Sequence, residues 1–128
     1  MPGLSTTWSG PEAMLGRFPI YQVDAFADAA FTGNPAAIVL LEEWLPTALM
    51  QSIAAENNQS TTAFLVRRAG THALRWFTPT IEEEICGHAT LAAGWLVLEK
   101  LETGREHVSF DTRAGAQRKT HSRWPRRD

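Results

Sequence analysis

The sequence predicts an α+β fold in which a curled antiparallel or mixed sheet wraps around a buried central helix. Between residues 89 and 98 the apolar side chains fall on every side of a helix, so the helix expected at about residues 88–101 has no face for solvent. Several segments of five or six residues have the alternating or continuously apolar pattern of strands. A flat two-layer arrangement would leave one face of the helix wet, so we expect the sheet to curl around it.

The expected strands follow one another at short spacing along the chain. Tyr21, Val23 and Ala25 alternate with polar residues, which is the period of a half-buried strand. A strong turn signal, residues 32–35, leads to the next strand. We expect further strands, with a hairpin turn at residues 69–70 between the third and the fourth, at residues 36–41, 61–66, 73–77 and 107–112.

The first helix is predicted to start at Pro46 and to end at the Asn57-Asn58 pair. Proline is tolerated at a first helical position because its missing N–H would be unpaired there. The pattern predicts two faces for this helix. The buried stripe comprises Leu45, Leu49, Met50, Ile53 and Ala54, and the exposed side comprises Gln51, Ser52 and Glu56. Gly104 is the expected stop of the second helix.

Length and composition indicate one ordinary globular domain. The chain has 128 residues, of which 44% are hydrophobic and 20% charged. One cysteine excludes an internal disulfide and is compatible with a reducing compartment. We find no apolar run of the roughly 20 residues that a membrane span needs, and no secretory signal pattern, so a cytoplasmic location is expected.

Composition and charge divide the chain into three expected parts. Residues 1–17 read as a loose extension, in which Met14 could be the natural start, and residues 18–112 as the folded part, which is acidic. Residues 113–128 hold six Lys/Arg, one acid and few aliphatic side chains, so we expect a disordered tail. An altered reading frame or a truncation explains such a tail better than a nucleic-acid arm does, because the folded part shows no platform for nucleic acid.

Residues Cys86-Gly87-His88-Ala89-Thr90 join a strand-like segment to the buried helix. Unpaired N–H groups and the positive end of the helix dipole make such a helix start an anion site. An imidazole beside it, that of His88, suggests acid–base chemistry on a small carboxylate. The plainer alternative is that His88 caps or packs and that Cys86 is a small buried hydrophobe.

The blocks of the chain, taken in order, resemble the phenazine-biosynthesis PhzF-like family, whose fold is shared with diaminopimelate epimerase. The resemblance covers about residues 18–112, and several blocks together make it specific. They are Val23-Asp24-Ala25-Phe26, the segments 31–37, 49–58 and 62–66, Arg75-Trp76-Phe77-Thr78-Pro79-Thr80, and Cys86-Gly87-His88-Ala89-Thr90.

This resemblance implies a longer protein with two similar halves, of which the present chain is the N-terminal one. Each half is a sheet around a central helix, and the two helix starts face a shared cleft that holds the substrate carboxylate. The implied reaction is proton transfer without a cofactor or metal. By position, Gly87 and His88 match the family's helix-mouth residues, His88 matches its substrate-contacting histidine, and Gly33 and Asn34 match the turn bordering the cleft.

One departure from the family pattern concerns the proton-transferring base. The family places a glutamate where this chain has Thr61, and a hydroxyl is no base near neutral pH. Glu56 is expected on the exposed side of its helix and is a poor substitute. Residues Glu82 to Glu84 lie nearer the helix mouth, but they are expected to form a solvated strand edge. Cys86 is expected to be structural, because the resemblance implies a partner cysteine that this chain lacks.

The leading hypothesis is therefore a PhzF-like isomerase or epimerase half that acts on a small carboxylate-bearing metabolite, with weak or no turnover by this chain alone. The alternative is a non-catalytic half-domain that binds a small anion or a partner chain. Either way, we expect homo-oligomers or another association through the exposed cleft face, because large apolar patches drive association. A membrane or nucleic-acid partner is not expected.

Overall fold

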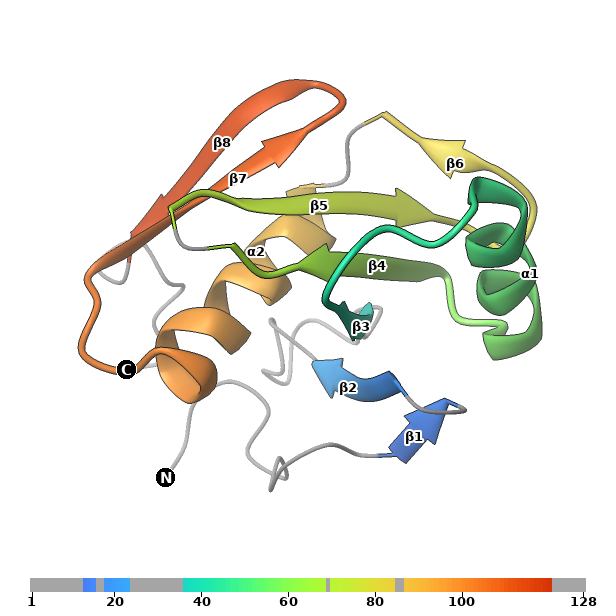
Figure 1. Cartoon of the computed structure of the whole chain (residues 1–128), viewed down its shortest axis with the longest axis horizontal. Helices are drawn as coiled ribbons and strands as arrows, with labels where there is room; N and C mark the ends of the chain where they lie inside the picture. The colour runs from blue at the N-terminus through green and yellow to red at the C-terminus, as the bar shows by residue number, and fades with distance from the viewer. Residues whose placement is uncertain (1–12, 16–17, 24–35, 69, 85–86, 121–128) are drawn as a thin grey trace, which may run out of the picture.

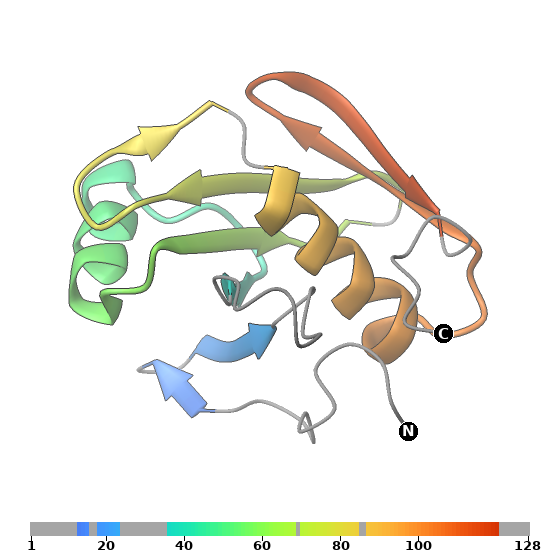
Figure 2. The ribbon, with the colours of Figure 1, turned by 180° about the vertical axis from the view of Figure 1, so that it is seen from behind.

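The fold is a mixed sheet with one helix on each face (Figures 1 and 2). The computed structural model describes residues 13–15, 18–23, 36–68, 70–84 and 87–120. Within these residues the sheet has eight strands. The elements are β1 (Ala13–Leu15), β2 (Phe18–Val23), β3 (Ala36–Leu41), α1 (Thr47–Asn57), β4 (Thr61–Val66), β5 (His72–Phe77), β6 (Glu82–Glu83), α2 (Gly87–Leu96), the π-helical turn η1 (Val97–Leu101), β7 (His107–Thr112) and β8 (Gly115–Thr120).

The strand directions explain why the two helices lie on opposite faces. The strand order is β1-β2-β3-β4-β5-β7-β8, and β6 pairs with β5. Helix α1 connects the parallel strands β3 and β4, and α2 connects the parallel strands β5 and β7. Because β4 and β5 are antiparallel, the second connection runs in the reverse direction. Parallel strands are normally joined by right-handed connections, and both connections here move across the sheet in the same direction. Because their strands run in opposite directions, the two helices must then lie on opposite faces.

Each central strand contributes to two separate cores, because successive side chains point to opposite faces. In β3, Ile38 belongs to the core under α2 and Val39 to the core under α1. In β4, Leu65 and Phe64 divide in the same way. All six side chains of β4 are buried, which accounts for the continuously apolar sequence of this strand. The structure thus confirms the predicted strands at residues 36–41 and 61–66.

The predicted burial of the second helix is confirmed. Trp95 is 4% exposed, and Ala89, Ala92 and Leu96 are fully buried. Helix α2 contacts β2, β3, β4 and β8. Because β2 and β8 lie near opposite edges of the sheet, those contacts require the sheet to curl around the helix. Neither helix in the described part of the chain is both long and apolar enough to cross a membrane.

The second helix differs from its prediction at both ends. It begins at Gly87 rather than at residue 88, and its α-helical part ends at Leu96. Residues 97–101 continue it as a π-helical turn, which Glu102 closes by donating its N–H to the carbonyl of Val97 at 2.7 Å. A π-turn inserts one extra residue per turn, a change that an apolar pattern does not reveal. Gly104, the expected stop, follows with a φ of 98°.

The first helix is rotated relative to the predicted stripe. It begins at Thr47, one residue after Pro46, and only Met50 and Ala54 are buried. Leu49, predicted to be buried, is 45% exposed. Gln51, predicted to face out, is half-buried and donates to the carbonyl of Thr78 at 2.9 Å. Ile53 and Leu45, the other predicted stripe residues, are only partly buried against the same core.

The end of this helix is as expected. Asn58 adopts a left-handed conformation, with a φ of 54°, and its N–H bonds to the carbonyl of Ala54 at 3.0 Å. Asparagine tolerates this conformation better than most residues.

The folded part extends beyond the predicted boundary at each end. Residues 13–15, within the expected loose extension, form β1 and pair with β2. Residues 115–120, within the expected disordered tail, form β8 and pair with β7 along the whole strand. A hairpin needs backbone pairing and a turn, and Gly115 provides that turn with a φ of 105°. A basic, aliphatic-poor sequence is compatible with an edge strand, where charge protects against unwanted pairing. Residues 121–128 lie outside the described part.

The remaining strand predictions are correct within one to three residues. Strand β7 matches residues 107–112, and β5 starts at His72, one residue earlier than predicted. The predicted hairpin of β4 and β5 is present. Strand β2 covers Phe18–Val23, whereas Ala25 lies outside the described residues.

The burial of Trp95 leads to a stability prediction. Trp95→Asp places an unpaired charge in the core under α2, at a cost of several kcal/mol. We therefore expect loss of cooperative thermal unfolding, followed by circular dichroism. Leu49→Asp, on the exposed side of α1, is the matched control and should melt within a few degrees of the parent chain. A Trp95→Asp protein with near-normal melting would contradict the buried position.

Candidate substrate-binding site

The amino end of α2 is where the sequence predicts a substrate carboxylate. The helix starts at Gly87, and His88 lies in its first turn. The first N–H groups of a helix have no partner within the helix, so this end can bind an anion. The side chain of His88 is outside what the structure describes, as are Gly33, Asn34 and Cys86.

Thr61, where the resemblance predicts the family's base, begins β4 on the sheet face that α2 covers. It is 8% exposed and alternates in phase with Ala63 and Leu65, which belong to the core under α2. Thr62 lies on the other face, where Asn57 donates to its hydroxyl oxygen at 3.2 Å. A carboxylate in place of Thr61 would therefore lie on the α2 side of the sheet.

Trp76 is on this same face, next to β4. It pairs in register with Ala63 on one side and Glu83 on the other, and its side chain is fully buried. Its indole N–H finds no acceptor among the described residues. Because an unpaired buried donor costs about 1–3 kcal/mol, this N–H is a group that a neighbouring acceptor would stabilise.

The predicted solvated edge at residues 82–84 is wrong for Glu82. The Glu82 side chain is 10% exposed and forms a bidentate pair with Arg75. Arg75 Nε donates to Oε2 and its second terminal nitrogen to Oε1, both at 2.7 Å. These hydrogen bonds from Arg75 lower the pKa of Glu82 below its ordinary value of 4.5, outweighing the burial that would raise it. A carboxylate held as an anion by a guanidinium is a poor base, so Glu82 does not replace the missing glutamate.

The other carboxylates considered as substitutes differ in their exposure. Glu84 and Glu56 are exposed, as expected, and Glu83 is half-buried beside Trp76. None of the three is part of an ion pair among the described residues. The candidate site therefore has a helix start and a buried threonine, but no described carboxylate in a position typical of a tuned base.

Arg75 is the centre of a cluster that sequence reasoning missed. Its guanidinium lies 5.3 Å from the ring centre of Trp44 and 5.5 Å from that of Phe77. Arg113, in the turn between β7 and β8, also reaches Glu82 Oε1, at 2.9 Å. The alternation of β5 offered one signal, since Arg75 interrupts an apolar strand and must find a partner where it is half-buried.

A second cluster, also missed, joins the end of η1 to the start of β5. His72 is 1% exposed, and its Nε2 lies 2.9 Å from Glu102 Oε2. The N–H of Arg68 donates to His72 Nδ1 at 2.9 Å, so the ring proton is on Nε2 and faces the carboxylate. Arg67, at 3.2 Å, and Arg105 donate to the same carboxylate.

Opposing influences act on the Glu102 carboxyl. Burial, the largest of them, would raise its pKa, but hydrogen bonds from Arg105, Arg67 and His72 lower it below 4.5. Glu102 is therefore an anion that stabilises the far end of the central helix.

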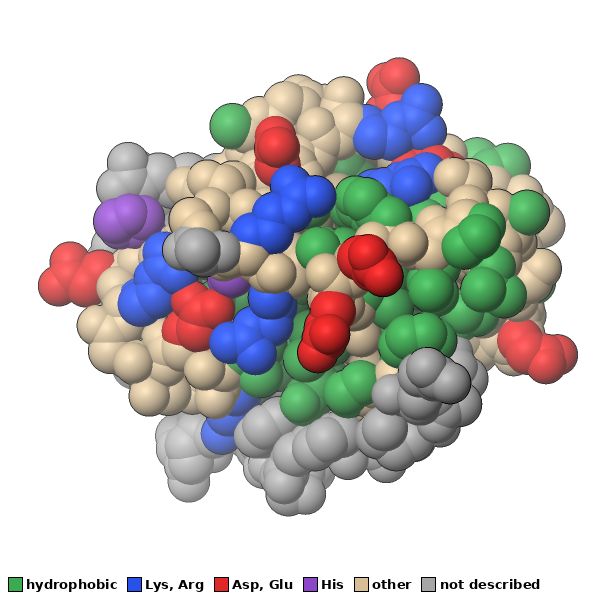
Figure 3. Space-filling view, viewed as in Figure 1, with side chains coloured by type: hydrophobic (Ala, Val, Ile, Leu, Met, Phe, Trp, Pro, Cys, Tyr) green, Lys and Arg blue, Asp and Glu red, His purple; other side chains and the backbone are tan. Residues whose placement is uncertain are grey.

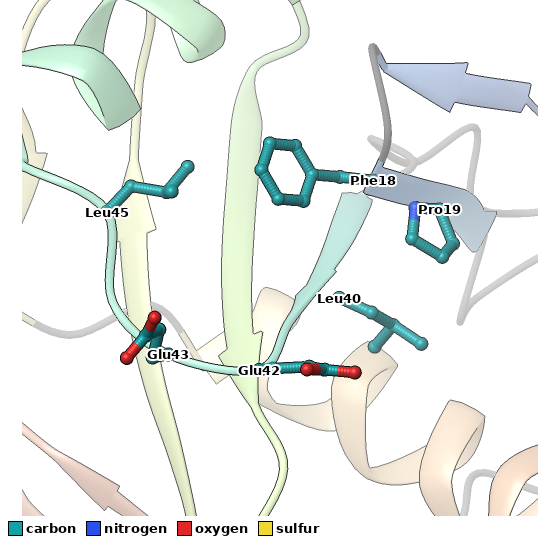
Figure 4. A pocket seen from close by; sticks show the side chains of 6 residues that line it. All are labelled: Phe18, Pro19, Leu40, Glu42, Glu43 and Leu45. Carbon is teal, nitrogen blue, oxygen red and sulfur yellow. The ribbon is translucent and has the colours of Figure 1, made fainter.

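A separate hollow of about 450 Å³ lies where β2 begins and β3 ends. Phe18, Pro19, Leu40, Glu42, Glu43 and Leu45 line it. In Figure 4 the rings of Phe18 and Pro19 lie on one side, Leu45 on the other, and the two carboxylates at the lower end. Figure 3 shows that hydrophobic side chains gather on the face viewed in Figure 1, with acidic ones among them. None of the six was predicted as a site residue.

Within the described ranges, no three His, Cys, Asp or Glu side chains are grouped to hold a metal ion.

The lowered pKa of Glu82 predicts a pH dependence of stability. Because the pKa is lower in the folded state, the pair stabilises the fold above about pH 4.5, and that contribution is lost as the pH falls through the folded pKa. Glu82→Gln should therefore lower the free energy of urea unfolding at pH 7, and the difference from the parent chain should shrink toward pH 3. Glu84→Gln, at an exposed carboxylate, is the control. An equal deficit at both pH values would contradict the ion pair.

Comparison with known proteins agrees with the fold and the sequence blocks. The family PhzC-PhzF, described as phenazine biosynthesis-like protein, matches residues 23–124, which runs past the boundary expected at Thr112. An uncharacterized isomerase of Pseudomonas aeruginosa is 53% identical over 96 residues, which are 75% of this chain and 37% of that protein.

Solved structures lead to the same family. One is a PhzF family protein of Enterococcus faecalis, which is 48% identical and has a TM-score of 0.74. The match covers 80% of this chain and 40% of the E. faecalis chain. A PhzC/PhzF protein of Clostridium difficile covers the same shares, at 40% identity and a TM-score of 0.74. This chain thus spans about two fifths of the relatives it matches. With more than half of its residues matched, the chain belongs to the PhzF-like phenazine biosynthesis family.

Proposed function

We propose that this chain carries one half of a PhzF-like isomerase or epimerase site and binds a small carboxylate-bearing metabolite at the amino end of α2. Alone it turns that metabolite over weakly or not at all. The observation that carries this proposal is the burial of Thr61 on the α2 face of the sheet. The resemblance implies that Thr61 stands where the family has its base. The similarity to an isomerase of P. aeruginosa supports the reaction class.

Carboxylate binding needs only the start of the helix and its neighbours. The N–H groups of Gly87 and His88 precede the first intrahelical hydrogen bonds, and the helix dipole adds positive potential there. The 3.6-residue geometry of α2 presents them together at one end. No cofactor is required for binding of this kind, and the His88 imidazole would be the proton donor beside it.

Proton transfer needs a base as well, and Thr61 does not provide one. Removing a proton from a carbon next to a carboxylate leaves an anion, and the proton must go to a group whose pKa is near the working pH. A threonine hydroxyl does not accept it near pH 7. A general base typically contributes about 10²–10⁴-fold to a rate, so its loss alone reduces turnover greatly.

The alternative function is association through the cleft face. The resemblance implies that, in the longer relatives, a second half faces the start of the central helix. The chain spans about two fifths of those relatives. Under this alternative, another chain binds the same face. Ile81, six residues before the start of α2, is 58% exposed, and exposed apolar surface would favour a partner.

Restoring the base should restore exchange. We expect Thr61→Glu to incorporate solvent deuterium at the carbon next to the carboxylate, in a panel of amino acids and dihydroanthranilate-like acids, at least about 100-fold faster than the parent chain. Mass spectrometry of the recovered substrate measures this.

Two controls separate base chemistry from other effects. Glutamine has the size of glutamate without its charge, so Thr61→Gln should stay inactive. Ser60→Glu places a carboxylate at an exposed neighbouring position and should stay inactive too. Clear exchange by the parent chain, abolished in His88→Ala, would show that the chain is active without a glutamate at position 61 and would refute this part of the proposal.

Association is tested by gel filtration with light scattering. We expect a species larger than the 14.2 kDa monomer at concentrations of about 100 µM, as an exposed apolar face predicts. Ile81→Lys should shift the population toward the monomer. A strictly monomeric parent chain would exclude the association.

A further inference from the structure

The outer edge of β5 is shared by two strands that arrive from different directions. Strand β7 pairs with the first part of β5, at His72 and Ala73, in parallel. Strand β6 pairs with the last part, at Trp76 and Phe77, antiparallel. Between the two lies Arg75, at a position where neither strand supplies a register partner. The yellow β6 and the orange β7–β8 hairpin diverge at this point in Figure 1.

Strand β6 has little backbone pairing of its own. Its register comprises two residue pairs, Trp76 with Glu83 and Phe77 with Glu82. Two residues are a short strand even for a sheet edge, so backbone hydrogen bonds alone hold it weakly. The chain reaches the first residue of α2, Gly87, four positions after β6 ends. The position of β6 therefore restricts where α2 can start.

The Arg75 cluster stabilises the position of β6, which has few backbone hydrogen bonds of its own. Glu82 lies diagonally across from Arg75, and both guanidinium–carboxylate hydrogen bonds measure 2.7 Å. Arg75 is itself fixed, because it donates to the Thr47 hydroxyl at 3.2 Å and lies over two aromatic rings. Arg113 adds a contact from the β7–β8 turn. The carboxylate of Glu82 thus joins β5, β6 and the β7–β8 hairpin.

We propose that Arg75 and Glu82 are positioning residues for the carboxylate site: by fixing β6, they hold the first turn of α2 where its N–H groups meet the substrate. This inference rests on the proposed function for its ligand, but its effect on the helix start can be measured without one. The cluster lies on the α1 face of the sheet, so it acts through the backbone of β6 and does not touch the substrate.

The second cluster supplies a matched control at the other end of the same helix. Glu102 follows η1 and is held by Arg67, Arg105 and His72, so Glu102→Gln removes a comparable ion cluster. It should loosen the carboxyl end of the helix and leave the amino end in place. A general loss of stability would instead loosen both ends of the helix, in Glu82→Gln as well as in Glu102→Gln.

The experiment measures amide hydrogen exchange by NMR in the full chain and in Glu82→Gln, Arg75→Lys and Glu102→Gln. The amides of Leu91 and Ala92 are the first that can bond to the carbonyls of Gly87 and His88, so they report the first turn. We expect their exchange to rise about tenfold or more in Glu82→Gln and Arg75→Lys, relative to the amides of Leu96 to Leu98. In Glu102→Gln the faster exchange should appear at Leu96 to Leu98 instead.

Sodium benzoate serves as the probe of carboxylate binding in the same samples. Shifts of the Gly87 and His88 amides should give a dissociation constant about fivefold weaker or more in Glu82→Gln and Arg75→Lys, and unchanged in Glu102→Gln. Equal exchange at both ends of α2 in every variant, or no change in any, overturns the positioning role. A third outcome is faster exchange confined to one end of α2, with no amide shift on adding benzoate to the parent chain. It would confirm that the cluster positions the first turn and would refute the proposed carboxylate site.

Discussion

The burial of α2 on all sides is the constraint on which the rest of this fold depends. A helix without a polar face is stable in water only if neighbouring elements cover it completely, because each exposed large apolar side chain loses about 1.5–3 kcal/mol of burial. Strands near opposite edges of the sheet, β2 and β8, both contact α2, so the sheet has to curl. The curl in turn requires β8, whose sequence has little apolar character of its own.

Two ion clusters fix this helix along its length. Near the amino end, Glu82 pairs with Arg75 and Arg113 in the strand that leads into the helix. At the carboxyl end, Glu102 pairs with Arg67, Arg105 and His72. A buried hydrophobic contact is non-directional and permits sliding, whereas a bidentate guanidinium–carboxylate pair has one geometry. The apolar core thus stabilises α2, and the charged clusters set its position, which matters for a site at its first turn.

The errors of the sequence-based prediction have physical causes that differ from element to element. Leu49 was placed on the buried side of α1, but a helix that touches a sheet along Met50 and Ala54 leaves it half-exposed. Residues 115–120 were expected to be disordered because they lack aliphatic side chains, yet a hairpin forms through backbone pairing with β7. Glu82 was expected in solvent, but its partner Arg75 lies seven positions away along the chain and becomes a neighbour only when β6 pairs with β5.

The sequence by itself determined the family, the α+β class, the strands at residues 36–41, 61–66 and 107–112, and the buried central helix. These follow from local periodicity and from apolar runs, which act over a few residues. The expectation that Thr61 stands where the family has a glutamate also came from sequence alone, and it stays a prediction. Only the tertiary structure decided which charged side chains meet, where the sheet ends and which side of α1 is buried. Those features depend on contacts between strands far apart in the chain, and no local pattern encodes the register that brings them together.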